Sequence, residues 1–574
     1  MKTIITYLQP FYKRMSLGLL IKTAGTLVEL ALPYILSHIL KNVVVTQDIY
    51  QILFWGGAMV ACAGLACVCN VVANRMAAKV SRNFSEHVRH DLFDRTLRLS
   101  PAQTDAFTIP SLESRITTDT YNLHSFIGMM QRMGVRAPIL LVGGIAITLM
   151  MDSFLALSII AVLPFIFVTV FFISKNGIPL YTKVQESVDR MVRVVREDTQ
   201  GIRVIKALSK TEYEHRRYDS VNKKLVHDER KAGITMGTVN PIMTLLMNGA
   251  IVAVVALAAN RVANHQSDPE TVIAFMQYFT LISMAMMSVT RMFVMFSKSS
   301  ASAQRIEEVL KTPEDLTVKS ESEYPSVKTD AHITFENVNF SYKGKRSNLS
   351  DINLSVPHGG SLGIIGATGS GKSTLVKLLL RFYDVTSGAI RIDGQDIRTI
   401  PREKFYKKFG ISLQNDFLYA DTIEENIRFG RDLTHEDIVA AAKIAQADDF
   451  INAFLDGYDH VLSQKGTNVS GGQKQRLLIS RAVAAKPEIL ILDDSSSALD
   501  YKTDANLRRA LAENMKETTI VTVAQRVSSV KNCDVILVLD EGHIIGLGTH
   551  DHLMENCAEY KEISDSQMGG AIVE

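Results

Sequence analysis

The sequence predicts a multi-pass α-helical membrane domain followed by an α/β domain built around a parallel sheet. Three observations support this fold class. Six long apolar segments lie before residue 300, a glycine-rich loop joins an apolar strand to a helix in the second half, and a polar stretch separates the halves. A chain of 574 residues is long enough for several domains. We expect a membrane domain at 1–310, a linker at 311–330 and an α/β domain at 331–574.

Composition excludes two classes of protein. The chain has 62 Lys and Arg against 60 Asp and Glu, so its net charge of +2 does not indicate a nucleic-acid partner. Its five cysteines are an odd, scattered set and do not form a disulfide framework.

The six apolar segments are each long enough to cross a bilayer, which takes about 20 helical residues. They lie at approximately 16–38, 51–74, 128–151, 153–175, 236–260 and 271–297. Lysines and arginines gather on the side of the two long connections, and the other side offers little beyond Lys41 and Arg261. The positive-inside rule therefore predicts a multi-pass protein of the plasma membrane with a cytoplasmic N-terminus and a cytoplasmic second domain. The tips of the long connections, near Ser111–Thr118 and Val204–Glu214, are expected to contact that domain.

Several side chains within the predicted spans are candidates for substrate contact. Glu29 lies well inside the first span, and Arg132 and Arg136 lie near the start of the third, where buried charge often lines a polar path. Met287 belongs to a methionine-rich stretch of the sixth span, and such surfaces accept varied apolar ligands. The alternative is that Glu29 pairs with an arginine and that the methionines pack against lipid or other helices.

The α/β domain opens with residues 332–342, whose alternation of apolar and polar residues predicts a strand. Further on, Leu362–Ile365 predicts a buried strand and Leu375–Phe382 a helix, joined by a phosphate-binding loop. Backbone N–H groups of such a loop surround phosphate oxygens, and the helix N-terminus favours negative charge. Lys372 is expected to reach the β- and γ-phosphates of a nucleotide, and Ser373 to hold Mg²⁺. The predicted phosphate-binding residues are Gly366, Thr368, Gly369, Ser370, Gly371, Lys372, Ser373 and Thr374.

Two more motifs follow the loop. Glu488–Asp493 predicts an apolar strand that ends in a carboxylate, the Walker B arrangement in which Asp493 orients Mg²⁺. Shortly before it, residues 469–473 open a helix that we expect to run to Ala485. A Ser-Gly-Gly turn at a helix N-terminus is a second anion site. Its residues are Ser470, Gly471, Gly472 and Gln473.

Together these motifs resemble those of the ATP-binding cassette (ABC) transporter family, and the six-span domain resembles its exporter type. The motifs are the loop at 366–374, Gln414 after a strand, Val469–Gln473, the strand at 489–493 and Ser497–Asp500. The resemblance implies a dimer of half-transporters with two ATP molecules between them, each touching the loop of one chain and the Ser-Gly-Gly signature of the other. It also implies that Tyr342 stacks on adenine, that Gln414 senses Mg²⁺ and the membrane domain, and that Asp500 communicates across the dimer. The segments near 111–118 and 204–214 would be coupling helices.

Two positions depart from the family pattern. Asp494 stands where the family usually has the glutamate that polarises the attacking water, and Gln525 stands where it usually has a histidine. Aspartate is one methylene shorter, and a base must lie about 2.6–3.2 Å from the proton it takes. A retraction of about 1 Å can lower a rate about 10²-fold. Glutamine can hydrogen-bond a γ-phosphate but carries no titrating proton.

These departures predict a site that holds ATP and Mg²⁺ but hydrolyses ATP slowly, beside an intact signature that serves the partner's ATP. We therefore expect the degenerate half of a heterodimeric exporter of small amphipathic, multidrug-like compounds. A homodimer with two slow sites is the alternative in assembly. The alternatives in function are a lipid, peptide or siderophore transporter of the same fold, and an ATP-regulated module or channel with little turnover.

Overall fold

The computed structural model describes residues 2–263, 269–342, 344, 347–414 and 416–568. The chain divides into two compact units. The first unit comprises Met1–Leu97 and Thr108–Thr312, and the second comprises Arg98–Phe107 and Pro313–Glu574. The predicted boundary near 310 is close to this division, but a short segment of the first long connection belongs to the second unit.

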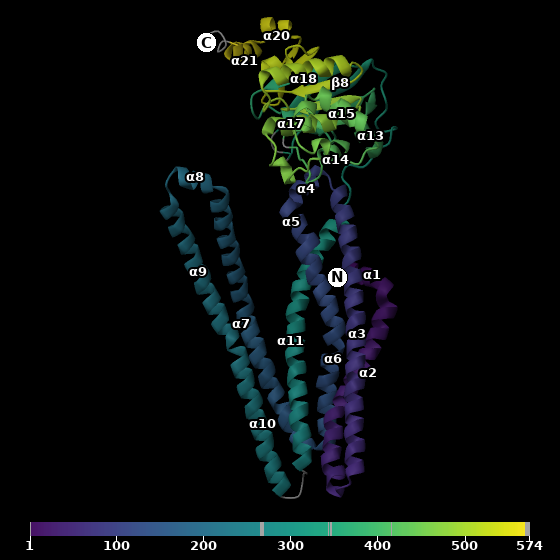
Figure 1. Ribbon diagram of the computed structural model, residues 1–574, viewed down its shortest axis with the longest axis vertical. Coiled ribbons are helices and arrows are strands. Elements are labelled where there is room, and N and C mark those ends of the chain that lie inside the picture. The colour runs from purple at the N-terminus through teal and green to yellow at the C-terminus, as the bar shows by residue number, and fades with distance from the viewer. Residues whose placement is uncertain (1, 264–268, 343, 345–346, 415, 569–574) are drawn as a thin grey trace. The chain divides into compact units, whose positions relative to one another are not determined.

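All regular structure described in the first unit is helical (Figure 1). The helices of this unit are α1 (Lys2–Leu8), α2 (Tyr12–His38), α3 (Ile49–Arg98, of which Arg98 falls in the second unit), α5 (Ile109–Ser114), α6 (Thr120–Met151), α7 (Ser153–Gln200), α8 (Ile202–Ala207), α9 (Thr211–Gly237), α10 (Val239–Ala263) and α11 (Pro269–Lys311). α6 packs along α11, and α7 lies beside α9 and α10, with α8 at the tip (Figure 1).

Five helical segments are long and apolar enough to cross a membrane within the described residues. They are Ile4–Thr46, Ile49–Arg98, Ile109–Met151, Thr244–Arg261 and Pro269–Val289. These segments correspond to five of the six predicted spans. The remaining span, 153–175, lies on α7, where only the shorter stretch Ser153–Val162 qualifies as an apolar helix. A count of six spans therefore stays a prediction.

Local sequence explains the sharp turn between α6 and α7. Asp152 has extended backbone angles and ends α6, and its carboxylate accepts the backbone N–H groups of Phe154 and Leu155 at 3.0 and 3.2 Å. This is an N-cap, which satisfies donors that the first turn of a helix cannot pair. Arg261 of α10 then lies 3.4 Å from the other Asp152 carboxylate oxygen.

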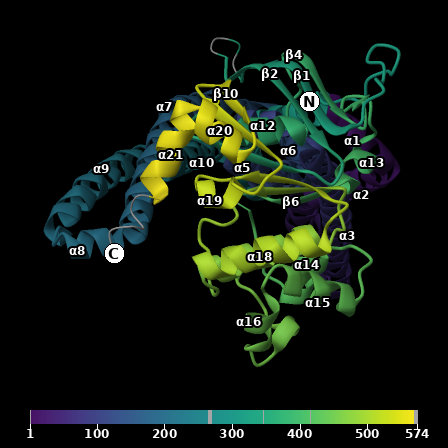
Figure 2. The ribbon, with the colours of Figure 1, turned by 90° about the horizontal axis from the view of Figure 1, so that it is seen from above.

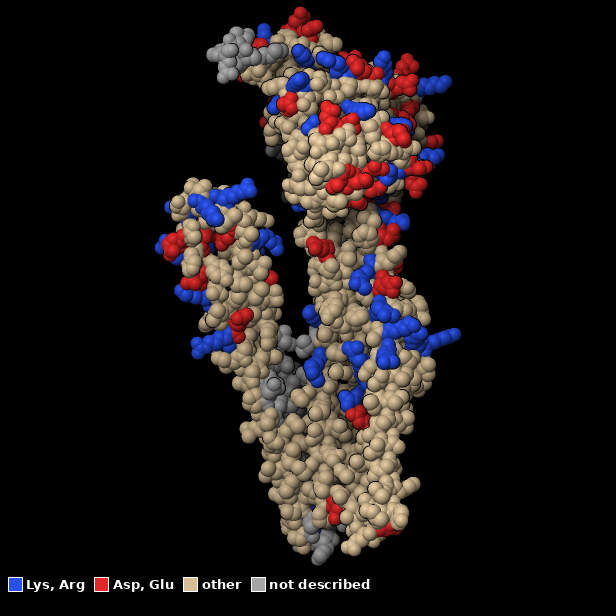
Figure 3. Space-filling model, in the orientation of Figure 1, with Lys and Arg blue, Asp and Glu red and all other residues tan. Residues whose placement is uncertain are grey.

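The interior of the first unit is a cluster of apolar side chains from five helices. It includes Leu30, Leu140, Leu155, Val254, Phe275, Phe279 and Ile282. Tyr278 is fully buried there, and its hydroxyl donates to the carbonyl of Leu30 at 2.7 Å. Outside this cluster, large apolar side chains are exposed, as at Phe54 and Leu245. Figure 3 shows a broad surface of these helices with almost no charged side chain, as expected of a surface in contact with lipid.

The second unit contains two sheets. One is antiparallel, with strand order β2-β1-β4-β5, and the other has the order β10-β9-β3-β8-β7-β6 and is parallel except for β10. The strands are β1 (Ala331–Phe340), β2 (Leu349–Pro357), β3 (Ser361–Gly366), β4 (Ser387–Ile392), β5 (Gln395–Asp396), β6 (Phe409–Ser412), β7 (Ile489–Asp493), β8 (Thr519–Val523), β9 (Val535–Asp540) and β10 (His543–Gly548). β1, β3 and β7 confirm the strands predicted at 332–342, 362–365 and 488–493, and β6 is the strand expected before Gln414.

Helices cover the sheets and form a separate subdomain. They are α4 (Pro101–Phe107), α12 (Lys372–Leu379), α13 (Arg402–Lys407), α14 (Ile423–Arg428), α15 (His435–Ile444), α16 (Asp448–Asn452), α17 (Gly471–Val483), α18 (Tyr501–Asn514), α19 (Val527–Val530), α20 (His550–Asn556) and α21 (Ala558–Met568). Within the second unit, α14, α15 and α16 lie at the opposite end from β1, β2 and β4 (Figure 2). Each end has its own apolar core.

Two segments that lie outside the sheets, α4 and the predicted linker, are bonded to the rest of the second unit. α4 is held through Ser100, whose hydroxyl donates to Asp315 at 2.7 Å, and through Asp105, which accepts the hydroxyl of Tyr383 at 3.1 Å. The predicted linker is also attached, because Arg381 donates to the carbonyl of Thr317 at 2.7 Å.

The first segment that is expected to contact the second domain follows α4 in the sequence. Residues 111–118 lie in the first unit, where the buried Arg115 donates to the carbonyl of Arg305 at 2.8 Å and pairs with Glu308 at 2.9 Å. α4, which precedes this segment, belongs to the second unit. Contact of residues 111–118 with the second unit stays a prediction.

Candidate nucleotide site

The glycine-rich loop folds between β3 and α12, as predicted. Gly369 and Gly371 have φ angles of 88° and 109°, which disfavour residues with a side chain. A Cβ on Gly371 would lie 2.7 Å from Leu349, so the close packing of the loop also requires glycine there. Lys372 begins α12, and its ammonium group donates to the carbonyls of Gly366 and Ala367 at 2.7 Å each. Lys372 therefore hydrogen-bonds to the phosphate-binding loop itself. The same ammonium group would bind the phosphates of a nucleotide.

The loop forms one wall of a cavity of about 210 Å³. The predicted site residues in its lining are Thr368, Gly369, Gly371, Lys372, Ser373, Thr374, Gln414, Asp493, Asp494 and Gln525. They come from four separate parts of the second half of the sequence, and the parallel sheet brings them together because β3, β6, β7 and β8 end at the same edge. The fold therefore assembles the Walker A loop, the Walker B strand and both departures from the family pattern around one cavity.

The two carboxylates at the end of β7 have perturbed protonation. Asp493 is buried, and burial together with the neighbouring charge of Asp494 raises the pKa of Asp493 to about 6. Burial also raises the pKa of Asp494, while a hydrogen bond from Gln414 and the charge of Lys372 oppose the rise. Ser373, Gln414 and Asp493 offer oxygen ligands in the same cavity, the donor type that Mg²⁺ prefers. The residues present therefore fit Mg²⁺, whose charge would offset the repulsion between the two carboxylates.

Asp494 is held by two glutamines. The side-chain amide of Gln414 donates to Asp494 Oδ2 at 3.1 Å, and that of Gln525 donates to the same oxygen at 3.4 Å. The backbone of Asp494 has a φ of 50°, a left-handed conformation that aspartate tolerates better than most residues. The position at which the family pattern expects a catalytic base thus carries a short carboxylate that is restrained by two uncharged amides.

The Ser-Gly-Gly-Gln motif caps α17. Ser470 is the N-cap residue, and its hydroxyl accepts the backbone N–H of Gln473 at 3.2 Å. The Gln473 side chain in turn accepts the backbone N–H of Ser470 at 2.8 Å, which completes a capping box. Gly472 is tightly packed, since a Cβ there would lie 3.0 Å from the carbonyl oxygen of Ala498. Ser470, Gly471, Gly472 and Gln473 do not line the cavity beside Lys372, and their contact with a second nucleotide stays a prediction.

Asp500 and Tyr342 also lie outside the cavity lining. Asp500 is the N-cap of α18 and accepts the backbone N–H and the hydroxyl of Thr503 at 2.9 and 2.8 Å, bonds that lower the pKa of Asp500. Tyr342 is 40% exposed, and its hydroxyl donates to Thr374 at 3.4 Å. An exposed ring beside the first turn of α12 is suitably placed for stacking on a base, which stays a prediction.

Two residues that contribute to the site, Asn348 and Gln475, belong to none of the motifs recognised in the sequence. Asn348 lines the cavity, and its side chain accepts the backbone N–H of Tyr342 at 3.1 Å. Gln475 donates to the backbone carbonyl of Asp494 at 3.2 Å and accepts the backbone N–H of Ala498 at 3.0 Å. Gln475 therefore connects the signature helix to the end of β7.

In the first unit, Glu29 and Arg136 form a two-point ion pair, with contacts of 2.6 and 3.2 Å. The pairing that the sequence left as an alternative is thus present. Arg132 lies instead in a separate cavity of about 420 Å³ with His124, Arg291 and several methionines. Met287 is half-buried on α11 and does not belong to that lining.

Comparisons with known proteins cover nearly the whole chain. The family described as ABC transporter transmembrane region matches residues 15–286, and the family described as ABC transporter matches residues 349–497. An uncharacterized ABC transporter ATP-binding protein of Mycobacterium tuberculosis is 32% identical over 572 residues, which is 99% of this chain and 98% of that protein. An uncharacterized ABC transporter ATP-binding protein of Bacillus subtilis is 32% identical over 571 residues, with 99% of both chains covered.

A solved structure of a bacterial Atm1-family ABC exporter with ATP bound has the same fold. The TM-score is 0.81, the identity is 24%, and the match covers 96% of this chain and 98% of that one.

Proposed function

Because this chain belongs to the ABC transporter family, we propose that it is one half of an ATP-driven exporter whose own nucleotide site binds ATP and Mg²⁺ but hydrolyses ATP slowly. It would pair with a second half-transporter in the plasma membrane, with its N-terminus and second unit in the cytoplasm. Its signature residues Ser470–Gln473 would complete the partner's site. The substrate would be a small amphipathic compound, moved by alternating access.

One observation carries the proposal of a slow site. Asp494, whose carboxylate is one methylene shorter than that of the family glutamate, accepts hydrogen bonds from Gln414 and Gln525, and neither amide can take a proton from water. Other residues predicted to bind phosphate and Mg²⁺, including Lys372 and Asp493, line the same cavity. The site therefore has the groups for binding and lacks a well-placed base.

The residues of this chain support the following sequence of events. Lys372 would exchange its two carbonyl partners for phosphate oxygens, and the N–H groups of the loop and of α12 would surround the phosphates. Bound Mg²⁺ would neutralise phosphate charge. Ser470 of this chain would contact the nucleotide held by the partner, so that both ATP molecules close the dimer. Hydrolysis in the partner's site would reopen it.

ATPase activity tests the proposal. The chain would be purified in lipid alone and together with a candidate partner, a second ABC half-transporter from the same genome. We expect the pair to hydrolyse ATP, Asp494→Ala in this chain to change the rate by less than about twofold, and substitution of the partner's equivalent carboxylate to abolish turnover. Brisk hydrolysis by this chain alone, lost on Asp494→Ala, would refute the slow-site proposal and support a homodimer with an aspartate base.

A second candidate for the substrate is a lipid or peptide that carries negative charge. The cavity that contains Arg132 and Arg291 favours it, because none of the ion pairs found among the described residues involves either guanidinium. Addition of an acidic lipid to the purified pair should raise ATPase activity. We expect Arg132→Gln or Arg291→Gln to remove that stimulation and Arg230→Gln, on the exposed surface of α9, to preserve it. Equal stimulation of all three variants would exclude this cavity as the binding site.

A further inference from the structure

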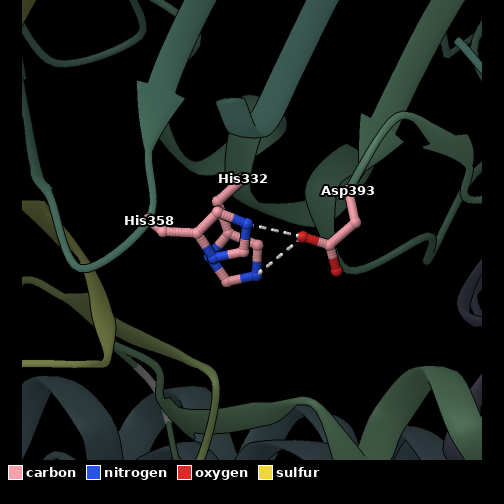
Figure 4. A group of neighbouring side chains, drawn as sticks. All are labelled: His332, His358 and Asp393. Atoms are coloured by element: carbon pink, nitrogen blue, oxygen red, sulfur yellow. Dashed lines mark ion pairs between the residues drawn. The ribbon is translucent and has the colours of Figure 1, made fainter. Parts of the chain in front are cut away.

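Two histidines and an aspartate meet on the second unit, away from the nucleotide cavity (Figure 4). His332 lies in β1, His358 follows β2, and Asp393 lies between β4 and β5. The distances from Asp393 Oδ1 are 2.9 Å to His358 Nε2 and 3.9 Å to His332 Nε2. The antiparallel sheet brings these residues together because β1 pairs with both β2 and β4.

His332 has one ring nitrogen without a hydrogen-bond partner. Its side chain is 2% exposed, and Nε2 faces Asp393 with no hydrogen bond within the described residues. The other nitrogen, Nδ1, lies 2.7 Å from the hydroxyl oxygen of Thr519. That hydroxyl can donate to the carbonyl of Pro357 at 3.4 Å and then accepts from Nδ1 of His332. In this tautomer the lone pair of His332 is on Nε2, directed into the cluster.

The ring of His332 lies against the ring of His358. The two rings stack with centroids 4.2 Å apart, an arrangement that two charged imidazoles would disfavour. A neutral imidazole whose second nitrogen is fixed by a hydrogen bond is the form in which histidine binds metals.

We propose that His332, His358 and Asp393 form a binding site for a divalent transition-metal ion of the Zn²⁺ type. Two imidazole nitrogens and one carboxylate oxygen are a ligand set that suits Zn²⁺, leaving a fourth position for water. Tetrahedral Zn²⁺ with these ligands has ligand atoms about 3.4 Å apart. The two measured distances of 2.9 and 3.9 Å lie on either side of this value.

Binding requires a small movement of the exposed members. His358 must turn out of the stack, and its side chain is 61% exposed. Asp393 is 42% exposed and can adjust as well. His332 is buried and already points its free nitrogen into the cluster, so the ion would be fixed on one rigid ligand and captured by two mobile ones.

The positive charge of Lys408, beside the cluster, is offset by the carboxylates of Asp393 and Glu488. Lys408 lies 3.5 Å from Asp393 Oδ2, the oxygen that faces away from the histidines, and it also pairs with Glu488. The lysine therefore leaves Oδ1 available to an ion. All of these residues lie at the edge of the parallel sheet where its strands begin, since Thr519 opens β8, whereas the nucleotide cavity lies where the strands end. A metal ion there would connect the loops that follow β2 and β4 to β1 without touching the nucleotide.

Metal titration of the full chain tests the proposal. The protein would be purified in detergent without a histidine tag or nucleotide, stripped with a chelator, and titrated with Co²⁺, whose visible absorption reports tetrahedral nitrogen and oxygen ligands. Zn²⁺ affinity would follow from competition with a chromophoric chelator. We expect one ion per chain, with Co²⁺ displaced by Zn²⁺, and at least a tenfold loss of affinity in His358→Ala and Asp393→Asn.

We expect both variants to fold as the unmodified chain does. His358 is exposed, and asparagine tolerates the left-handed backbone of Asp393, whose φ is 55°. His543→Ala, at an exposed position of β10, is the matched control and should bind Co²⁺ as the unmodified chain does. The absence of Co²⁺ absorption in the unmodified chain, or equal affinity in all four proteins, would overturn the proposal. The readout is independent of ATP hydrolysis and transport, so its failure would leave the proposed function untouched.

Discussion

The side-chain amide of Gln525, just beyond the end of β8, donates to the carboxylate of Asp494, just beyond the end of β7, at 3.4 Å. β7 and β8 are parallel neighbours, with Asp493 paired to Val523. The register of the sheet therefore brings the two positions that depart from the family pattern into direct contact. A change at either position alters the environment of the other, so the two should be tested together.

Restoring the family residues at these two positions should activate the site. Asp494→Glu extends the carboxylate by one methylene, and Gln525→His supplies a ring that can hold a proton. We expect Asp494→Glu/Gln525→His to raise hydrolysis in this chain's own site by up to about 10²-fold, and either single change to give less. Single-turnover ATP hydrolysis, measured with a partner whose own carboxylate is removed, isolates this site.

The control for that experiment is Lys372→Ala in the restored variant. It removes the lysine that lines the cavity and should return the rate to background. An unchanged rate in Asp494→Glu/Gln525→His would mean that the geometry of the two positions does not limit hydrolysis.

The raised pKa of Asp493 predicts that the free energy of unfolding depends on pH. Its pKa in the folded, nucleotide-free protein is about 6, above the value of 3.8 for an unperturbed carboxyl. The folded state therefore holds the proton more tightly, so its stability falls as pH rises from about 4 through 6. Asp493→Asn removes this penalty and should stabilise the nucleotide-free protein at pH 7.5 by at most about 3 kcal/mol. Thermal unfolding at several pH values measures the difference, which should vanish near pH 4; a gain that persists at pH 4 would have another cause.

The pair of Glu29 and Arg136 predicts a specific pattern of non-additivity. Glu29→Gln leaves Arg136 in the first unit without its carboxylate and should destabilise the protein by about 1–3 kcal/mol, because a partly buried charge loses its partner. Arg136→Gln should do the same, whereas Glu29→Gln/Arg136→Gln should recover much of the loss. Thermal unfolding midpoints of the four proteins in one detergent form the double-mutant cycle.

The same cycle separates a structural role from a role in substrate binding. Recovery of both stability and substrate-stimulated ATPase in the double variant would assign the pair to structure. Recovery of stability with loss of stimulation would assign it to the substrate.

The protein contains two similar capping boxes, and only one of them belongs to the Ser-Gly-Gly signature. A comparison of the two separates a role of the signature in ATP hydrolysis from its role in helix capping. Ser470 caps α17 with Gln473, and Thr434 caps α15 with Asp437 in the same way. Ser470→Ala and Thr434→Ala should each lower stability by about 1 kcal/mol. Only Ser470→Ala should also lower the ATPase activity of the assembled pair, by tenfold or more if its hydroxyl contacts the partner's ATP. Equal ATPase activity in the two variants would remove Ser470 from the active site.

The parts of the site that could be predicted are those encoded by consecutive residues. The loop around Lys372 and the strand that ends at Asp493 depend on local sequence, because glycine conformations and apolar runs are features of a few consecutive residues. Their meeting around one cavity follows from parallel strands that end at the same edge. Asn348 and Gln475 could not be found in this way, since their roles are set by packing between distant segments.

The first unit was predictable in outline and not in its contacts. Apolar length located five spans, because transfer into a bilayer depends on composition. The ion pair of Glu29 with Arg136, and the separation of Arg132 from that pair, depend on how α2 and α6 face each other. The cluster of His332, His358 and Asp393 could not be predicted either, because its members lie in one strand and two separate strand connections with no motif spacing.

The hydrogen bond between Tyr383 and Asp105 spans 278 residues of sequence within one compact unit. A ribosome that adds about 5–20 residues per second makes α4 roughly 14 to 56 s before it makes Tyr383. During biosynthesis, α4 must therefore remain accessible while the intervening helices are inserted into the membrane. A polypeptide that starts at Pro313 would lack α4 and would leave Tyr383 and Asp315 without these partners, so the order of synthesis and the completeness of the second unit are linked.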